Sequence, residues 1–387
     1  MKRNEVRIIN IEIHNFKNVE FGHINLDNNK YLSSILGLYG QNGSGKTALI
    51  DAIALLKNAI CGLPINKQFA DFINIDSEYS EFKFKFRISN NDYVSEVVYS
   101  FKLRKENRVE QNVDIASNVI VVPIVYDELF SASMQSNESA YKMQDIINTS
   151  SNFQTFGPST KYKQLMSSDI DVNDIIVIKK MTSLQSRSFL FSKELLDFIR
   201  QKDSIYRNII EDIINFGNIN LFIIDTRNNA LISLDAFPVA FKIQDGDKQI
   251  QGNIAISSEP SIVPKEIFNI LQNLIDSMNI VLKEMIPELT VEIKNLGPSL
   301  LRDGQEGCFV QLLSNRNGKK IPIKFESEGI KKIISILQLL IVVYNNPSIT
   351  VAIDELDAGI FEYLLGEILS IISQSGKGQL IFTSHNL

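Results

Sequence analysis

One stretch of the sequence decides the fold, and it reads Gly40-Gln41-Asn42-Gly43-Ser44-Gly45-Lys46-Thr47. It matches G-x-x-x-x-G-K-[ST] in full. An apolar segment at residues 34–39 precedes it, and residues 47–60 after it have apolar side chains at helical spacing. Glycines let the backbone curl so that successive N–H groups and the helix N-terminus face phosphate oxygens. We therefore predict that these eight residues surround the phosphates of a nucleotide, with Lys46 at the β- and γ-phosphates and the Thr47 hydroxyl on Mg²⁺.

A second candidate site follows the apolar strand expected at residues 349–353. Asp354 and Glu355 come directly after this strand, so we expect both carboxylates at the carboxyl edge of a sheet, beside the phosphates. We predict that Asp354 holds Mg²⁺ through water and that Glu355 polarises the attacking water. An acidic pair can also simply favour a helix N-terminus. Its place downstream of the glycine loop favours the catalytic interpretation.

Two further segments are expected near the same phosphates. His385 follows the strand expected at residues 379–383, so its imidazole could contact the γ-phosphate, whereas His14 and His23 lack such a context and are expected to be structural. Ser327-Glu328-Gly329 opens a helix, so it is either a simple helix cap or a second anion site. Because the chain already has its own glycine loop, an anion site at Ser327 and Gly329 would indicate a nucleotide shared between two subunits.

The order of the predicted elements indicates an α/β fold. Strands are expected at residues 6–13, 24–26, 82–88, 93–103 and 119–125, loops or a mobile lobe at 131–168, and helices at 192–216 and at 264–286, before Pro287. In the last third, a hairpin turning at Asn317-Gly318 precedes helices at 328–344 and 360–373 that alternate with strands at 349–353 and 379–383. This alternation is typical of a largely parallel sheet. We divide the chain into an N-terminal lobe at 1–126, an inserted and mainly helical lobe at 127–290, and a C-terminal lobe at 291–387.

Composition limits the partners and the location that we expect. The 387 residues carry a net charge of −6, which gives no general attraction to nucleic acid, so binding to DNA or RNA is possible but unsupported. Only Cys61 and Cys308 are present, which excludes a framework of several disulfides and fits a reducing compartment. The apolar run at residues 330–344 is interrupted by Lys331, Lys332 and Gln338, so we expect a cytoplasmic protein with no membrane span.

Five stretches, in this order, resemble the ABC-type ATPases of the RecF, SMC and OLD group: IEIHNFKNV, GQNGSGKT, ESEGIKK, VAIDELDAGI and FTSHN. The resemblance is closest to the stand-alone AAA-family ATPases that accompany prokaryotic anti-phage effectors. It implies an α/β P-loop NTPase, with an ABC-type ATPase head that has a mixed or parallel sheet, an antiparallel β subdomain and an inserted helical lobe. Neither a coiled-coil arm nor a TOPRIM nuclease domain is expected.

The resemblance also implies roles for particular residues. Residues 40–47 would be the Walker A loop, and Ser327 with Gly329 would be the signature. Asp354-Glu355 would be the Walker B pair, Asp357 the D-loop acid and His385 the switch histidine. The usual signature is LSGGQ-like, and here only Ser327 and Gly329 are kept. A glutamine of the Q-loop is not placed by the sequence.

ATP and Mg²⁺ are the cofactors that the resemblance implies, with Glu355, His385 and Lys46 as catalytic residues. It further implies a homodimer, or a higher even-numbered oligomer, that closes around nucleotide and controls a separately encoded nuclease or toxin in anti-phage defence. Two alternatives stay open, a RecF-like DNA repair ATPase and a scaffold that binds ATP without turnover. Strong, salt-sensitive binding to duplex DNA would favour the first alternative, and a lack of phosphate release would favour the second.

Overall fold

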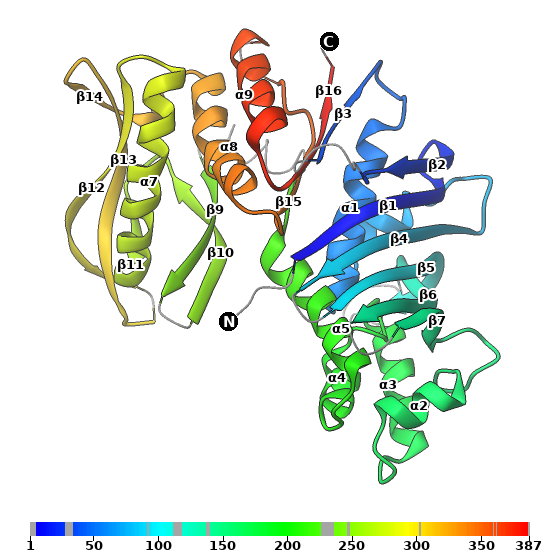
Figure 1. Cartoon of the computed structure of the whole chain (residues 1–387). Helices are drawn as coiled ribbons and strands as arrows, with labels where there is room; N and C mark the ends of the chain where they lie inside the picture. The colour runs from blue at the N-terminus through cyan, green and yellow to red at the C-terminus, as the bar shows by residue number, and fades with distance from the viewer. Residues whose placement is uncertain are drawn as a thin grey trace. The chain divides into compact units, whose positions relative to one another are not determined.

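The computed structural model describes residues 5–27, 34–90, 93–110, 118–136, 140–225, 236–245, 248–301, 303–358, 360 and 362–385. The chain forms two compact units. Figure 1 colours the chain by residue number, from blue at the N-terminus to red at the C-terminus. The first unit comprises Met1–Lys30 and Gly40–Ile223, and the second comprises Tyr31–Tyr39 and Ile224–Leu387. Helices and both parallel and antiparallel sheets are present, as expected for the predicted α/β class.

The first unit is built on an antiparallel sheet of six strands in the order β2-β1-β4-β5-β6-β7. The strands are β1 (Glu5–Phe16), β2 (Val19–Asn25), β4 (Tyr79–Ser89), β5 (Tyr93–Glu110), β6 (Asn118–Ser136) and β7 (Ala140–Asn148). Side chains alternate between buried and exposed along β4, which places Phe82, Phe84 and Phe86 on the buried face. Phe82 lies opposite Phe101 of β5, with ring centroids 5.2 Å apart. Because the buried face of β4 carries phenylalanines at every second position, the sequence of this strand alternates clearly between apolar and polar residues.

Helices complete the first unit: α1 (Lys46–Ile60), α2 (Ser159–Leu165), α3 (Val172–Leu184), α4 (Lys193–Arg200) and α5 (Ile205–Asn215), with the short helical turns η1 (Lys67–Ala70) and η2 (Phe216–Asn220). The strand β8 (Leu221–Ile224) spans the boundary between the two units in the chain. Ser192 caps α4 through the N–H of Leu195, as predicted. The single helix expected at 192–216 is wrong, however, because it is interrupted after Arg200. Ser204 is extended and caps α5 with its own side chain, which restarts the helix.

The polar segment at 131–168 is not the loop region that we expected. It contains the end of β6, the strand β7 and the helix α2. β7 is the last strand of its sheet, and most residues of its first half are exposed. An edge strand with a solvated face can therefore be polar and still pair, which hides it from a hydrophobicity pattern.

A buried carboxylate ties β6 to the segment before α4. Glu128 is 2% exposed and accepts hydrogen bonds from the hydroxyls of Tyr99 and Ser188 and from the N–H groups of Phe189 and Leu190. Burial raises the pKa of Glu128, while these donors act in the opposite direction. The carboxylate thus fixes the segment by supplying acceptors that no apolar side chain could supply.

In the second unit, three parallel strands lie in the order β3-β16-β15. They are β3 (Ser34–Tyr39), β16 (Gln379–Ser384) and β15 (Thr350–Ile353), and the register places Tyr39 opposite Ser384 and Ile353 opposite Phe382. Every residue of β15 and β16 is buried, which accounts for their continuous apolar sequences. The helices α8 (Glu328–Asn345) and α9 (Glu362–Ser375) alternate with these strands, as predicted.

The second unit also contains antiparallel strands. β11 (Ser261–Pro264), β13 (Glu306–Arg316) and β12 (Leu289–Leu300) form one sheet, and β14 (Lys319–Pro322) pairs with β13 across the predicted turn at Asn317-Gly318. The helix α7 (Lys265–Met285) packs along this sheet (Figure 1). β9 (Ala236–Asp245) and β10 (Lys248–Ser257) form a separate hairpin, and η3 (Ile323–Phe325) leads to α8.

The three-lobe division at residues 126 and 290 stays a prediction. Within 127–290 the structure has the helices α2 to α5 and α7, but also the strands β7 to β11. In the described part of the chain, no helix combines the length and the apolar character that a membrane crossing requires.

Candidate nucleotide-binding site

The glycine loop directly follows β3 in the chain and leads into α1. Gly40, Gly43 and Gly45 have φ values of 146°, 81° and 88°, in the region that side-chain residues rarely adopt. At Gly45 space is also limiting, because a Cβ atom would lie 2.7 Å from Cγ2 of Val19. The loop therefore needs glycine for its backbone conformation and for a close approach to the β1–β2 turn.

Lys46 begins α1 and is only 9% exposed. Its ammonium group donates hydrogen bonds to the carbonyl oxygens of Gly40 and Gln41, at 2.5 and 3.0 Å. No acidic residue lies in the first turn of α1, and Gly45 provides no side-chain cap, so the positive end of the helix and the lysine charge point toward the loop. Thr47 is half-buried in the same turn. This arrangement is suited to an anion of the size of a phosphate group.

The remaining loop residues, Gln41, Asn42 and Ser44, are exposed. A neighbour that the sequence did not reveal is Asn18, whose side-chain amide donates to the carbonyl oxygen of Gly43. The preceding residue, Lys17, has a φ of 52° and pairs with Asp51 of α1. The turn between β1 and β2 thus holds both the loop and the helix. Asn18 belongs to the stretch IEIHNFKNV, which carried the family resemblance. Nothing in that stretch indicates a contact with Gly43, 25 positions further along the chain.

Asp354 follows β15 in the second unit and is fully buried. The hydroxyl of Thr383, on the neighbouring strand β16, donates to Oδ1 of Asp354 at 2.6 Å. The N–H of Asp354 donates to the carbonyl oxygen of Ile224, the last residue of β8. The carboxylate is consequently fixed at the carboxyl edge of the parallel strands, where we predicted it.

Glu355 has a left-handed backbone conformation, with a φ of 51°. Its N–H donates to the hydroxyl of Thr383 at 2.8 Å, and its carbonyl oxygen accepts a hydrogen bond from the ammonium group of Lys332. The side chain of Glu355 is 37% exposed, and its Oε1 lies 3.4 Å from Nε2 of His385, which is 40% exposed. A fixed backbone therefore presents an accessible carboxylate beside an accessible imidazole.

Asp357 lies in the turn after Glu355 and accepts the N–H of His385 at 2.9 Å. Burial, with a smaller contribution from the negative charge of Asp357, raises the pKa of Tyr39 at the end of β3. Asp354, Glu355 and Asp357 follow β15 and His385 follows its parallel neighbour β16, so these four residues gather at one edge of the sheet in the second unit. Their catalytic and binding roles stay predictions.

Thr383 and Lys332 complete this cluster, and neither was predicted. Lys332 lies on α8 and is 5% exposed. Burial lowers its pKa to about 8, and the charges of Asp357, Glu355 and Asp354 act in the opposite direction. One indication of their importance is present in the sequence: Thr383 lies in the stretch FTSHN and Lys332 in ESEGIKK, two of the stretches that carry the family resemblance.

Ser327 lies at the start of α8, as expected. Its exposed side chain accepts a hydrogen bond from the N–H of Ile330 at 3.4 Å, and Gly329 belongs to the first turn. Lys331 pairs with Glu328 in that turn, at 3.2 Å. The structure thus describes a helix cap at this position, and a contact with a nucleotide on another subunit stays a prediction.

The residues expected to hold Mg²⁺ have suitable donor atoms. The carboxylate of Asp354 and the hydroxyl of Thr47 are oxygen donors, and Mg²⁺ at nucleotides usually takes one or two protein ligands beside phosphate oxygens and water. The described residues contain no cluster of three or more His, Cys, Asp or Glu that could hold a metal. The roles of Asp354 and Thr47 as ligands of Mg²⁺ stay predictions.

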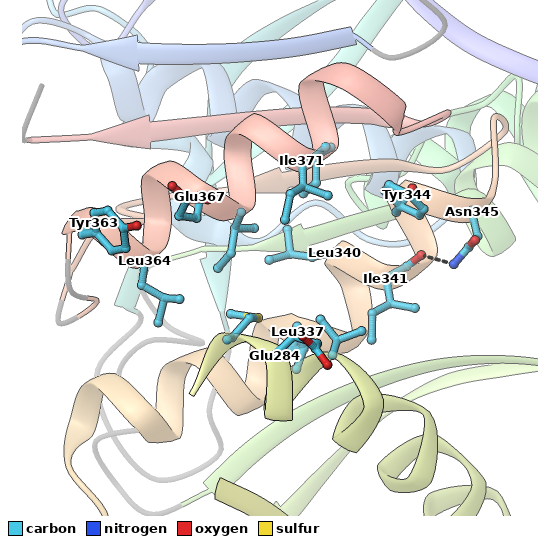
Figure 2. A pocket seen from close by; sticks show the side chains of 14 residues that line it. Glu284, Leu337, Leu340, Ile341, Tyr344, Asn345, Tyr363, Leu364, Glu367 and Ile371 are labelled. Carbon is cyan, nitrogen blue, oxygen red and sulfur yellow. Dashed lines mark hydrogen bonds between the residues drawn. The ribbon is translucent and has the colours of Figure 1, made fainter. Parts of the chain in front are cut away.

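A groove of about 520 Å³ lies between α7, α8 and α9 of the second unit (Figure 2). Its lining is mostly apolar and includes Leu337, Leu340, Ile341 and Ile371, with Glu284 and Glu367 as its charged residues. None of the predicted site residues lines it. An apolar groove with carboxylates is unsuited to a triphosphate, so we do not assign the nucleotide to it.

Comparison with known proteins identifies one family. The sequence model of the family described as "AAA domain, putative AbiEii toxin, Type IV TA system" matches residues 35–387, which include every predicted site residue. No curated protein matches the sequence.

Solved structures of SMC and RecF proteins are similar at low identity. An SMC head bound to the C-winged helix domain of ScpA is 13% identical, with 98% of this chain and 89% of that chain covered and a TM-score of 0.40. An SMC head with an extended coiled coil, bound to the C-terminal domain of ScpA from Pyrococcus furiosus, is 13% identical, with 98% and 90% covered and a TM-score of 0.43. The recombination mediator RecF with ATP is 14% identical, with 99% and 94% covered and a TM-score of 0.36. All three TM-scores lie below 0.5, so the family of this chain is assigned from the match to the sequence model alone.

Proposed function

Because the chain belongs to this family of AAA domains, we propose that it binds ATP at residues 40–47 and hydrolyses it with Glu355 as the general base. The observation that carries the proposal is the fixed and accessible carboxylate of Glu355, 3.4 Å from the imidazole of His385. The chain order supports it. β3 and β16 are neighbours in register, the glycine loop begins one residue after β3, and His385 comes one residue after β16.

The chemistry assigns a step to each residue. Glu355 accepts a proton from the water that attacks the γ-phosphorus, while the bond from that phosphorus to the bridging oxygen breaks and ADP leaves. His385 donates a hydrogen bond to an oxygen of the γ-phosphate. Lys46 offsets the negative charge of the β- and γ-phosphates. Asp354 and Thr47 would hold Mg²⁺, which would neutralise charge that develops on the phosphate oxygens.

Two identical chains are proposed to share their nucleotides. In this arrangement Ser327 and Gly329 of one subunit contact the γ-phosphate held by the glycine loop of the other, so ATP stabilises the dimer by mass action. The exposed cap at Ser327 supports this proposal, because a partner could reach it. Asp357, which accepts a hydrogen bond from the N–H of His385, would lie at the same interface between the two subunits.

The dimer is proposed to control a separately encoded nuclease or toxin in anti-phage defence. The family description supports a toxin and antitoxin setting, since such systems have two components. We place the protein in the cytoplasm, consistent with the free thiols of Cys61 and Cys308. With a net charge of −6, duplex DNA is not the favoured partner.

Replacement of Glu355 by Gln tests the proposed reaction. ATP binding should be retained, because Lys46 and the loop are unchanged, while phosphate release falls by about 10²–10⁴-fold, the usual effect of losing a general base. Glu362, an acid in the first turn of α9, provides the matched control as Glu362→Gln and should have little effect. Equal turnover by Glu355→Gln and wild type would show that another group orients the water. No turnover by the wild type, with ATP bound, would support the scaffold alternative.

A further inference from the structure

Lys332 is a buried cation whose ammonium group contacts the backbone of the proposed general base. We propose that Lys332 is a positioning residue, which holds the carbonyl oxygen of Glu355 and thereby aims its carboxylate. The proposal deepens the function given above and rests on it for its effect on turnover.

The backbone of Glu355 needs such support. Its φ of 51° lies in the left-handed region, which is unfavourable for a residue with a side chain unless its surroundings maintain it. Thr383 holds the N–H side of Glu355, and Lys332 holds the carbonyl side. The side chain projects from this fixed unit toward His385. Loss of either contact would therefore change the direction of the carboxylate.

Lys332 is 5% exposed, and a lysine is rarely this buried without a partner. The charges of Asp357, Glu355 and Asp354 act on its pKa, and all three residues come from the segment that follows β15. Lys332 lies five residues after Ser327 on the same helix, α8. A single side chain therefore connects the helix that begins at Ser327 with the segment that carries the base.

Lys332→Met tests this role while keeping most of the side-chain volume. We expect kcat to fall by about 10- to 100-fold, the scale for a misplaced catalytic group. KM and the Kd for ATP should change little, because Lys46 and Thr47 are not altered. Lys332→Arg keeps the charge and a donor, so it should recover part of the lost turnover. In the background of Glu355→Gln, Lys332→Met should have no further effect, since the two changes act on one group.

Lys331→Met is the matched control. Lys331 is adjacent on α8 and also 5% exposed, but its ammonium group pairs with Glu328 instead. Equal losses of kcat in both Met variants would indicate a general disturbance of α8 and overturn the proposal.

Amide hydrogen exchange of the full chain tests the positioning without relying on turnover. The peptide that spans residues 354–358 should exchange faster in Lys332→Met than in wild type, and at the wild-type rate in Lys331→Met. If Lys332→Met does not fold, the same comparison is made with Lys332→Arg, where we expect a smaller increase. Unchanged exchange in the folded Lys332 variant would refute the positioning role, whatever the ATPase activity of the wild type. An inactive wild type would instead count against the proposed function.

Discussion

Replacing Thr383 by Val should separate the effect of its hydroxyl from that of its shape. Oγ1 donates to the carboxylate of Asp354 at 2.6 Å and accepts the N–H of Glu355 at 2.8 Å, and the side chain is buried. A hydrogen bond to a charged group contributes about 1.5–3 kcal/mol and one between neutral groups about 0.5–1.5 kcal/mol, so we expect a loss of about 2–4.5 kcal/mol of unfolding free energy.

Thr350 provides a matched control in the same pair of strands. It is also buried, and its hydroxyl donates a single hydrogen bond to Oε1 of Gln379 at 3.0 Å, so Thr350→Val should lose only about 0.5–1.5 kcal/mol. Urea unfolding followed by far-UV circular dichroism measures both, which suits a chain without tryptophan. Phosphate release should fall in Thr383→Val, because the base loses one of its two backbone contacts, and stay near wild type in Thr350→Val. Equal destabilisation of the two variants, with equal turnover, would refute this account of the site.

Three other predictions concern the first unit. Lys46→Ala should weaken ATP binding by at least about tenfold, because it removes a charged hydrogen-bond donor to the phosphates, and calorimetry that gave equal affinities would contradict the assignment of the loop. Glu128→Ala should lower the unfolding free energy by about 3–5 kcal/mol, because it removes the shared acceptor of four buried donors; a loss below about 1 kcal/mol in urea unfolding would argue against this anchor. Burial raises the pKa of the Cys61 thiol to about 11, so the reactive thiolate is scarce at pH 8 and increases about tenfold per pH unit up to that value. Labelling of a Cys308→Ala variant by a thiol reagent checks this pH dependence, and fast labelling at pH 8 would show that Cys61 is not shielded.

The parts of the site that the sequence predicted are those fixed by chain order. The order of strand, glycine loop and helix is a local pattern, so the sequence predicted the position of the loop, although not its contact with Asn18. Asp354 and His385 each follow a buried parallel strand, and parallel neighbours bring their carboxyl ends to one edge. The prediction that these residues gather there is confirmed by the position of Thr383 against Asp354 and of Asp357 against His385.

The missed residues depend on contacts between distant segments. Lys332 and Glu355 are 23 positions apart, and Thr383 and Asp354 are 29 apart. A lysine on an apolar helix has the same sequence pattern whether it reaches solvent or a buried carbonyl oxygen. The edge strand β7 was missed for a related reason, because its partners and not its own residues determine its conformation.

These contacts also suggest how the proposed base could respond to nucleotide. Glu355 is held on one side by β16, which ends beside His385, and on the other by α8, which begins after Ser327. In the proposed dimer, His385 would contact the γ-phosphate of its own subunit and Ser327 that of the partner. Both contacts would therefore act on elements that directly hold the backbone of Glu355. A left-handed residue that depends on two such supports changes direction when either one moves, so the base would be aligned only when both nucleotide contacts are made.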